Sequence, residues 1–188
     1  MAVLVADGEA PIVDLDDELA LAAQTDPEAF GQLYRRHRLS VYRYLRSRTA
    51  SDDDAIELTA ITFERALVAL PRYRTRGGGV VAWLLRIARN AAIDAGRRTS
   101  AIPLDADVVD RGTGASPEAV AVANEERLAL AQALARLPDL QREAVMLRYT
   151  AGLTARQIGE ILGKSDTATQ KLLSRALATI REHYRDDA

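Results

Sequence analysis

The stretch GLTARQIGEILGKSDTATQKLLSRAL, residues 152–177, predicts one helix, a short turn and a second helix. A T-x-x-Q capping box that begins at Thr154 marks the start of the first helix. Gly163 supplies a left-handed end for that helix, and Ser165 or Asp166 caps the next one. The pattern therefore predicts a helix-turn-helix, a motif that many DNA-binding proteins use.

The second of these helices is predicted to have a buried side and an exposed side. Its apolar residues recur at helical spacing and can hold it against the rest of the domain. In a recognition helix, the N-terminal side chains meet base edges, while the cap and the cations meet phosphates. The candidate residues for binding duplex DNA are Thr154, Ser165, Thr167, Gln170, Lys171, Ser174 and Arg175. An ordinary helical hairpin with a polar outer face is the alternative explanation of the same pattern.

The charge of the chain is segregated into blocks that the formal net charge of -2 conceals. Residues 1–28 carry acidic but no basic side chains, whereas residues 29–50 carry arginines and no acid. Because salt screens charges over about 8 to 10 Å, each block acts locally on its own partners. The acidic balance therefore does not exclude a nucleic-acid partner, although any one basic block is also compatible with a solvated helix face.

Composition restricts the class of protein. Hydrophobic residues make up 48% of the chain, which is enough for packed cores. Cysteine is absent, which excludes disulfides, thiolate zinc sites and cysteine nucleophiles. The first residues have no secretion-signal pattern, and no apolar run is long enough to cross a membrane. We therefore expect a soluble cytoplasmic protein with no membrane insertion.

An enzyme is not expected from this sequence. His37 and His183 are far apart in the chain and unsupported, and no serine is recognised as a nucleophile paired with a base. The triple glycine at residues 77–79 lacks the lysine and hydroxyl residue of a phosphate-binding loop. We expect both histidines on helix surfaces, and we expect no metal and no cofactor.

Periodicity predicts an all-α fold with two small helical domains joined by a flexible linker. Asp26 followed by Pro27 marks one helix start, Ser51 marks another, and Pro71 ends the second helix. Trp83 lies in register with the apolar residues of a third long helix, which favours packing over stacking on a base. The predicted divisions are a flexible acidic segment (1–18), a first domain (19–98), a linker (99–117) and a second, helix-turn-helix domain (118–185).

Both domains together resemble a known family. The segments that carry the likeness are DPEAFGQLYRRH, the D-A-x-E-L-x-x-x-T-F run of residues 54–63, PRYRTRG with AWLLRIARNAAID, LPDLQREAVMLRY, and GLTARQIGEILGKS with LLSRAL. In this order they resemble the extracytoplasmic-function (ECF) group of bacterial RNA polymerase sigma factors, small members of the sigma-70 family. The resemblance covers about residues 26–98 and 124–182.

The resemblance implies polymerase-binding and promoter-binding residues. In the family, the second helix of the first domain grips a coiled coil of the largest polymerase subunit, and the matching residues are Asp54, Glu57, Leu58 and Phe63. The following loop and helix melt the minus-ten promoter element, and the matching residues are Tyr73, Arg74, Arg76, Arg86, Arg89, Asn90, Asp94, Arg97 and Arg98. Cations along an unpaired strand and a pocket for a flipped base suit that task. Asp94 either takes part or pairs with a neighbouring arginine.

The resemblance also implies partners. They are core RNA polymerase, through the coiled coil and the flap, promoter DNA at the minus-ten and minus-thirty-five elements, and an anti-sigma factor, for a protein that is monomeric when free. The acidic residues of the linker either mimic nucleic acid in the polymerase cleft or only keep the linker soluble. The acidic segment 1–18 either folds back on an arginine-rich surface or is disordered. The alternative function is a stand-alone helix-turn-helix regulator that binds duplex DNA without polymerase.

The sequence departs from the family pattern at two places. Ala60 and Ile61 stand where the family usually has glutamine and an acid, so the polymerase grip is expected to be weaker or to use a neighbouring contact. Thr167, Thr169 and Gln170 replace the usual start of the recognition helix. The promoter sequence is therefore not predictable by analogy.

Overall fold

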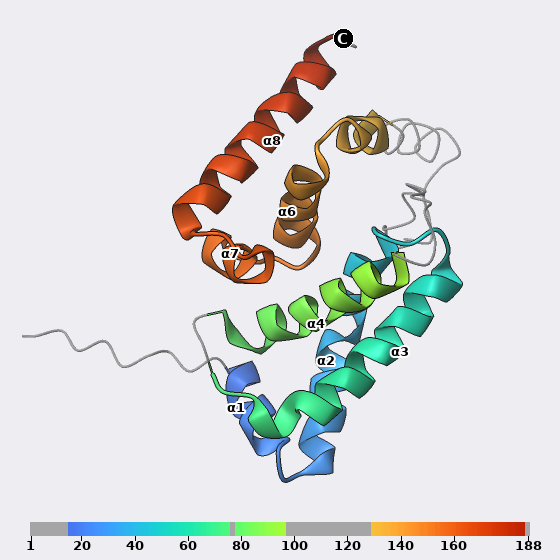
Figure 1. Ribbon diagram of the computed structural model, residues 1–188, viewed down its shortest axis with the longest axis vertical. Helices are drawn as coiled ribbons and strands as arrows, with labels where there is room; N and C mark the ends of the chain where they lie inside the picture. Colours follow the sequence, from blue (N-terminus) through green and yellow to red (C-terminus); the bar gives the residue numbers. More distant parts are fainter. Residues whose placement is uncertain (1–14, 76–77, 97–128, 187–188) are drawn as a thin grey trace, which may run out of the picture.

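The computed structural model describes residues 15–75, 78–96 and 129–186, with side chains as far as His183 (Figure 1). These residues are helical apart from short connections, which confirms the predicted all-α fold. The helices are α1 (Leu15–Ala22), α2 (Pro27–Arg46), α3 (Asp52–Ala69), the 3-10 turn η1 (Leu70–Arg72), α4 (Gly79–Gly96), α6 (Asp139–Thr150), α7 (Ala155–Leu162) and α8 (Asp166–Asp186). Residues 129–135 are also helical. The predicted linker, 99–117, lies outside the described residues.

The helix boundaries follow local capping chemistry. The Asp26 side chain accepts a hydrogen bond from the backbone N–H of Glu28 at the start of α2. Ser51 accepts from the backbone N–H of Asp54 at the start of α3. Both bonds satisfy donors that a helix N-terminus would leave unpaired, which is why the predicted starts are confirmed.

The expected flexible segment, residues 1–18, extends into ordered structure at its end. Residues 15–18 form the first turn of α1, and residues 1–14 lie outside the described part of the chain. Asp16 pairs with Arg36 of α2. The carboxylate of Asp17 is buried and accepts hydrogen bonds from the hydroxyl of Tyr73, at 2.5 Å, and from the backbone N–H of Val80, at 2.7 Å. These bonds join α1 to the start of α4.

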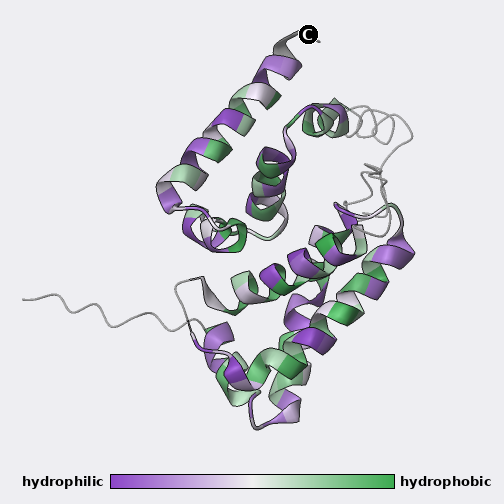
Figure 2. Cartoon of the chain, in the orientation of Figure 1, coloured by the Kyte–Doolittle hydropathy of each residue, from purple (hydrophilic) through white to green (hydrophobic). Residues whose placement is uncertain are grey.

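The first domain packs α1, α2, α3 and α4 around one hydrophobic core. Leu33 and Tyr44 from α2 and Leu84 and Leu85 from α4 are fully buried there. Each helix carries both hydrophilic and hydrophobic residues along its length (Figure 2), as expected of amphipathic helices that each bury one side.

Leu84→Ala is expected to lower the free energy of unfolding by about 2 to 5 kcal/mol, because it removes buried methyl groups and leaves a cavity. The expected loss follows from the position of Leu84, which is 0% exposed. Val68→Ala is the control, since Val68 is 83% exposed and its truncation should change stability by less than about 0.5 kcal/mol. Urea denaturation followed by circular dichroism measures both, and equal effects would contradict the assigned core.

The second domain packs directly on the first. Leu137, Val145 and Ala176 form a small cluster of their own, whereas Leu147 and Ile158 belong to the same core cluster as the first domain. In Figure 1, α7 and α6 lie beside α4, and the contacts confirm that α7 packs on α4 and α6 on α2. The sequence predicted two linked domains but did not predict this shared interface.

Candidate nucleic-acid and partner interfaces

The helix-turn-helix of the second domain is α7, a tight turn and α8. Thr154 accepts from the backbone N–H of Gln157, and the side chain of Gln157 accepts from the backbone N–H of Thr154, so the predicted capping box is present. Gly163 is left-handed, with φ of 66°, and ends α7 as predicted. A Cβ on Gly159 would lie 2.6 Å from the backbone oxygen of Lys164, so the close approach of α7 to the turn requires glycine.

The predicted duplex-binding residues are exposed to solvent, Thr154 at the start of α7 and the others at the start and on the outer face of α8. Ser165 caps the helix by accepting from the backbone N–H of Ala168. Thr169 is fully buried beneath this face, and its hydroxyl donates a hydrogen bond to the backbone carbonyl of Ser165. Lys171 and Arg175 form no ion pair with any residue that the structure describes. The exposed residues of the predicted set are Thr154, Ser165, Thr167, Gln170, Lys171, Ser174 and Arg175.

The outer face of α4 presents part of the predicted minus-ten set. Arg86, Asn90 and Asp94 are exposed along one side of the helix, and Arg89 is half-buried against the second domain. Asp94 forms an ion pair with Arg65 of α3 at 2.9 Å, so pairing with a neighbouring arginine is observed. Arg74 is exposed before α4. Three further members of the set, Arg76, Arg97 and Arg98, lie outside the described residues.

Tyr73 has a packing role in this structure. It is 4% exposed, its hydroxyl donates to Asp17, and its ring lies 4.9 Å from that of Trp83. The assignment of Tyr73 to direct DNA contact is therefore revised, because an enclosed ring cannot stack on a base without leaving the core. Trp83 packs against the core, as its spacing predicted.

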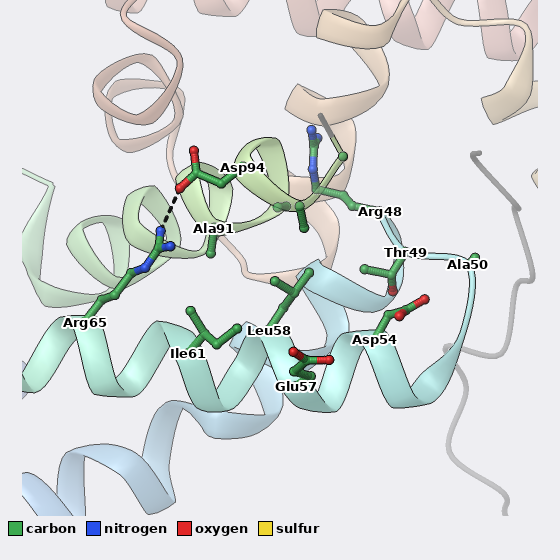
Figure 3. Close-up of a pocket in the computed structure, with 13 residues that line it drawn as sticks. Arg48, Thr49, Ala50, Asp54, Glu57, Leu58, Ile61, Arg65, Ala91 and Asp94 are labelled. Carbon is green, nitrogen blue, oxygen red and sulfur yellow. Dashed lines mark hydrogen bonds and ion pairs between the residues drawn. The ribbon is translucent and has the colours of Figure 1, made fainter. Parts of the chain in front are cut away.

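A groove of about 320 Å³ lies between the end of α2, α3 and the C-terminal part of α4 (Figure 3). Asp54 and Glu57 are exposed at its edge and form no ion pair with any described residue. Leu58 and Ile61 extend from α3 toward α4. The groove thus combines an apolar floor with unpaired carboxylates.

Two residues of the predicted polymerase set are core residues. Leu58 and Phe63 are only 7% and 4% exposed. The Phe63 ring packs edge-on against Tyr34, with ring centroids 4.8 Å apart. Phe63 is therefore assigned to support of α3 from within, whereas Leu58 forms part of the floor of the groove, where a bound partner would touch it.

Sequence reasoning missed a buried carboxylate on α6. Glu143 is 6% exposed and contacts three donors of the first domain, namely Tyr44, Arg48 and Arg89. Its position in the run LPDLQREAV gave no signal, because a glutamate beside polar residues is typical of an exposed helix face. Only the packing of α6 on α2 and α4 places it inside.

The two histidines are buried, so the expectation of surface histidines is wrong. His37 lies 3.2 Å from Asp16, and the Nδ1 atom of His183 lies 2.7 Å from Arg136. Packing of α1 on α2 and of α6 and α8 on each other encloses them. Within the described residues, no group of histidine, aspartate and glutamate side chains could hold a metal ion, and no helix is long and apolar enough to cross a membrane.

Comparison with known proteins accounts for both domains. Residues 33–102 match the family Sigma-70 region 2, and residues 127–180 match Sigma-70, region 4. The chain is 34% identical over 190 residues to the ECF RNA polymerase sigma factor BldN of Streptomyces coelicolor, an alignment that covers 95% of this chain and 70% of BldN. The chain belongs to the ECF sigma factors. This sigma factor directs transcription initiation and is not an enzyme.

Other similar proteins agree with this assignment. The ECF sigma factor SigD of Mycobacterium tuberculosis is 31% identical over 179 residues, covering 89% of this chain and 82% of SigD. Among solved structures, CnrH in complex with the cytosolic domain of CnrY matches with a TM-score of 0.70 and 25% identity, over 93% of this chain and 100% of CnrH. The sigma factor RpoE of Bartonella quintana, solved with the anti-sigma factor NepR, shares the fold with a TM-score of 0.63 and 20% identity over 86% and 99% of the two chains.

The family assignment sets aside the stand-alone regulator. A regulator that needs only a helix-turn-helix would account for α7 and α8 but not for the match of the first domain to Sigma-70 region 2. Sigma factors use both domains, because they bind core RNA polymerase as well as promoter DNA.

Proposed function

We propose that this sigma factor joins core RNA polymerase through α3 and places it on promoters that α4 and α8 read. The observation that carries this proposal is a pair of exposed polar faces, one on each domain. Arg86 and Asn90 lie on α4, and Lys171 and Arg175 lie on α8, each on a helix whose other side is in a core. Two readers on two domains suit two separate promoter elements.

The polymerase-binding surface is the exposed face of α3 beside the groove. Asp54 and Glu57 supply carboxylates, Leu58 forms part of the apolar floor of the groove, and Phe63 supports the helix from within. Ala60 is exposed and Ile61 half-exposed, so the two departures from the family pattern make this face more apolar. Hydrophobic contact replaces some of the polar contacts that the family uses there.

The minus-ten surface is the outer face of α4 together with the loop before it. Arg86 supplies a cation for the phosphates of the unpaired strand, and Asn90 supplies an amide for a base edge. Arg74 is exposed before α4, and the sequence places Arg76 before this helix and Arg97 and Arg98 after it. Arg65 neutralises Asp94, so this carboxylate does not repel the strand.

The minus-thirty-five surface is the N-terminal half of α8. Lys171→Ala combined with Arg175→Ala should weaken binding of the holoenzyme to the upstream duplex by about 1 to 3 kcal/mol for each base whose hydrogen bonds are removed. Each phosphate that is deprived of its cation should also reduce the salt dependence of the affinity by about 0.9 in log-log slope. Filter binding at several salt concentrations measures both quantities.

Arg38→Ala is the matched control for the α8 variant, because Arg38 is an exposed cation on α2 with no ion pair among the described residues. If the α8 variant kept its affinity for the duplex and its salt dependence, the surface that binds duplex DNA would have to lie elsewhere on the protein.

An anti-sigma factor is the proposed regulatory partner, and the cytoplasm is the proposed location. The similar structures of CnrH and of RpoE contain the cytosolic domain of CnrY and the anti-sigma factor NepR, respectively. We expect this chain to be a monomer until such a partner or the polymerase binds it.

The test is transcription with purified components. The chain is mixed with core RNA polymerase and a genomic library, and the transcription starts are mapped. Starts that share two spaced upstream elements are expected. Failure to co-purify with core polymerase, or the absence of new starts, would overturn the proposal.

A further inference from the structure

A buried ion cluster joins the two domains. One oxygen of Glu143 on α6 accepts hydrogen bonds from the hydroxyl of Tyr44, at 2.8 Å, and from Nε of Arg89, at 2.9 Å. The same oxygen, Oε1, lies 3.1 Å from Nη1 of Arg48. Tyr44 and Arg48 come from the end of α2 and the turn after it, and Arg89 comes from α4. Three donors of the first domain thus converge on one anion supplied by the second.

The carboxylate leaves this set of donors incompletely satisfied. Two guanidinium groups face one carboxylate, and the buried Nε–H of Arg48 has no acceptor among the described residues. Burial raises the pKa of the Tyr44 phenol above its usual value, so the hydroxyl stays a neutral donor. Arginine prefers to bind planar oxyanions with two parallel bonds. A phosphodiester group carries the same single negative charge on two oxygens as the Glu143 carboxylate, so it can replace that carboxylate in this set of donors.

The surface around the cluster continues the proposed minus-ten surface. Arg89 belongs to α4, one turn from Arg86, and is covered by the docked second domain. At the start of α4, Gln157 of α7 donates to the carbonyl of Gly78 at 2.9 Å. A Cβ on Gly78 would lie 2.3 Å from a carboxylate oxygen of Glu160. The second domain therefore contacts the region of α4 at its start, through Gln157, and again at Arg89, through Glu143.

We propose that Tyr44, Arg48 and Arg89 form a phosphate-binding site for promoter DNA, and that Glu143 occupies this site in the free sigma factor. This inference rests on the proposed function of α4. Glu143 acts as an internal competitor, because DNA phosphate and the carboxylate require the same donors. The second domain must therefore move away before the phosphate binds, which couples DNA binding to domain separation.

Glu143→Gln tests the competition in the full chain. The variant removes the negative charge and keeps the shape of the side chain. Its affinity for a fluorescein-labelled single-stranded DNA of mixed sequence should rise roughly 5- to 150-fold, the usual range of coupling between two sites. Fluorescence anisotropy measures it. Glu64→Gln is the matched control, since Glu64 is exposed on α3 and forms no ion pair with a described residue.

Adding Arg48→Ala to Glu143→Gln tests the site itself. The gain in affinity should disappear, because Arg48 is part of the proposed phosphate site. Unchanged DNA affinity of Glu143→Gln would overturn the competition, and a gain that survives Arg48→Ala would overturn the site.

Gln157→Glu weakens the interface by an independent route. The carboxylate still accepts from the backbone N–H of Thr154, so the capping box is kept, but it cannot donate to the carbonyl of Gly78 in the first domain. The domains should separate more often, so DNA affinity should rise with Glu143 intact, and small-angle X-ray scattering should show a larger radius of gyration. Gln32→Glu is the control, because Gln32 is exposed on α2. If Glu143→Gln does not fold, Gln157→Glu with and without Arg48→Ala decides the question, and separated domains without a gain in affinity would refute the inference.

Transcription by the wild-type chain with core polymerase distinguishes the two proposals. If the proposed function is wrong, the wild-type chain and core polymerase give no transcription, regardless of the DNA affinity of the free chain. Failure of the inference appears as normal wild-type transcription with free-chain DNA affinity that does not respond to Glu143→Gln or Gln157→Glu.

Discussion

Asp54→Arg combined with Glu57→Arg is expected to reduce the affinity of this sigma factor for core RNA polymerase by roughly 30-fold or more, the scale of disrupted charge pairs at interfaces. Both carboxylates are exposed at the edge of the α3 groove and have no ion-pair partner among the described residues. Reversal places two cations where the polymerase would meet two anions. The helix start should survive, because the cap of α3 uses the backbone N–H of Asp54 and not its carboxylate.

Biolayer interferometry with immobilised core polymerase measures the loss, and circular dichroism checks the fold. Glu18→Arg is the matched control, since Glu18 is an exposed acid on α1, away from the groove. Polymerase affinity equal to that of the control variant would place the polymerase contact elsewhere. Replacing Leu58 or Phe63 instead would not be a clean test, because both are buried and their truncation would disturb the core.

Arg86→Ala combined with Asn90→Ala is expected to lower the yield of open promoter complexes by roughly 10- to 100-fold, because the unpaired strand loses a cation and a base-edge contact. Both side chains are exposed on α4. Their removal leaves α8 intact, so binding to the upstream duplex should change little. Permanganate reactivity of unpaired thymines measures the opening of the DNA.

Gln32→Ala combined with Arg38→Ala is the matched control for the α4 variant, because it removes an exposed amide and an exposed cation from α2. Normal permanganate reactivity for the α4 variant would show that α4 does not hold the melted strand. An equal loss of upstream duplex binding would indicate a general folding defect instead.

The docked second domain bears on the regulation of promoter access. It covers Arg89 but leaves the outer face of α8 in solvent. In this arrangement the proposed minus-thirty-five reader is accessible while part of the proposed minus-ten reader is not. A free sigma factor that bound single-stranded DNA without polymerase would engage DNA unproductively, and the proposed role of the Glu143 contact is to oppose that binding.

Several site residues were predictable because their signals are local. The capping box at Thr154, the left-handed Gly163 and the Ser165 cap each involve residues within four positions of one another. The exposed residues of α8 followed from the same helix, since its apolar side left only one face for them.

Other site residues could not be placed from the sequence. Leu58 and Tyr73 lie within family motifs, yet their side chains are enclosed by residues from other helices. The two histidines are in register with the apolar sides of their helices. His37 lies four positions from both Leu33 and Val41, and His183 lies three positions after Ile180. The expectation of surface histidines followed residue type alone, whereas the periodicity indicated burial.

The sequence by itself determined the helical class, the helix starts, the two domains and the membership in the sigma family. Capping bonds, periodicity and family motifs each depend on residues that are close together in the chain, so they can be recognised without the structure. Only the tertiary structure decided where the domains meet and which charges lie between them. Tyr44 and Glu143 are separated by 99 positions, and Asp17 and Val80 by 63. Whether such a carboxylate is solvated or buried depends on packing between distant segments, and no local pattern contains that information.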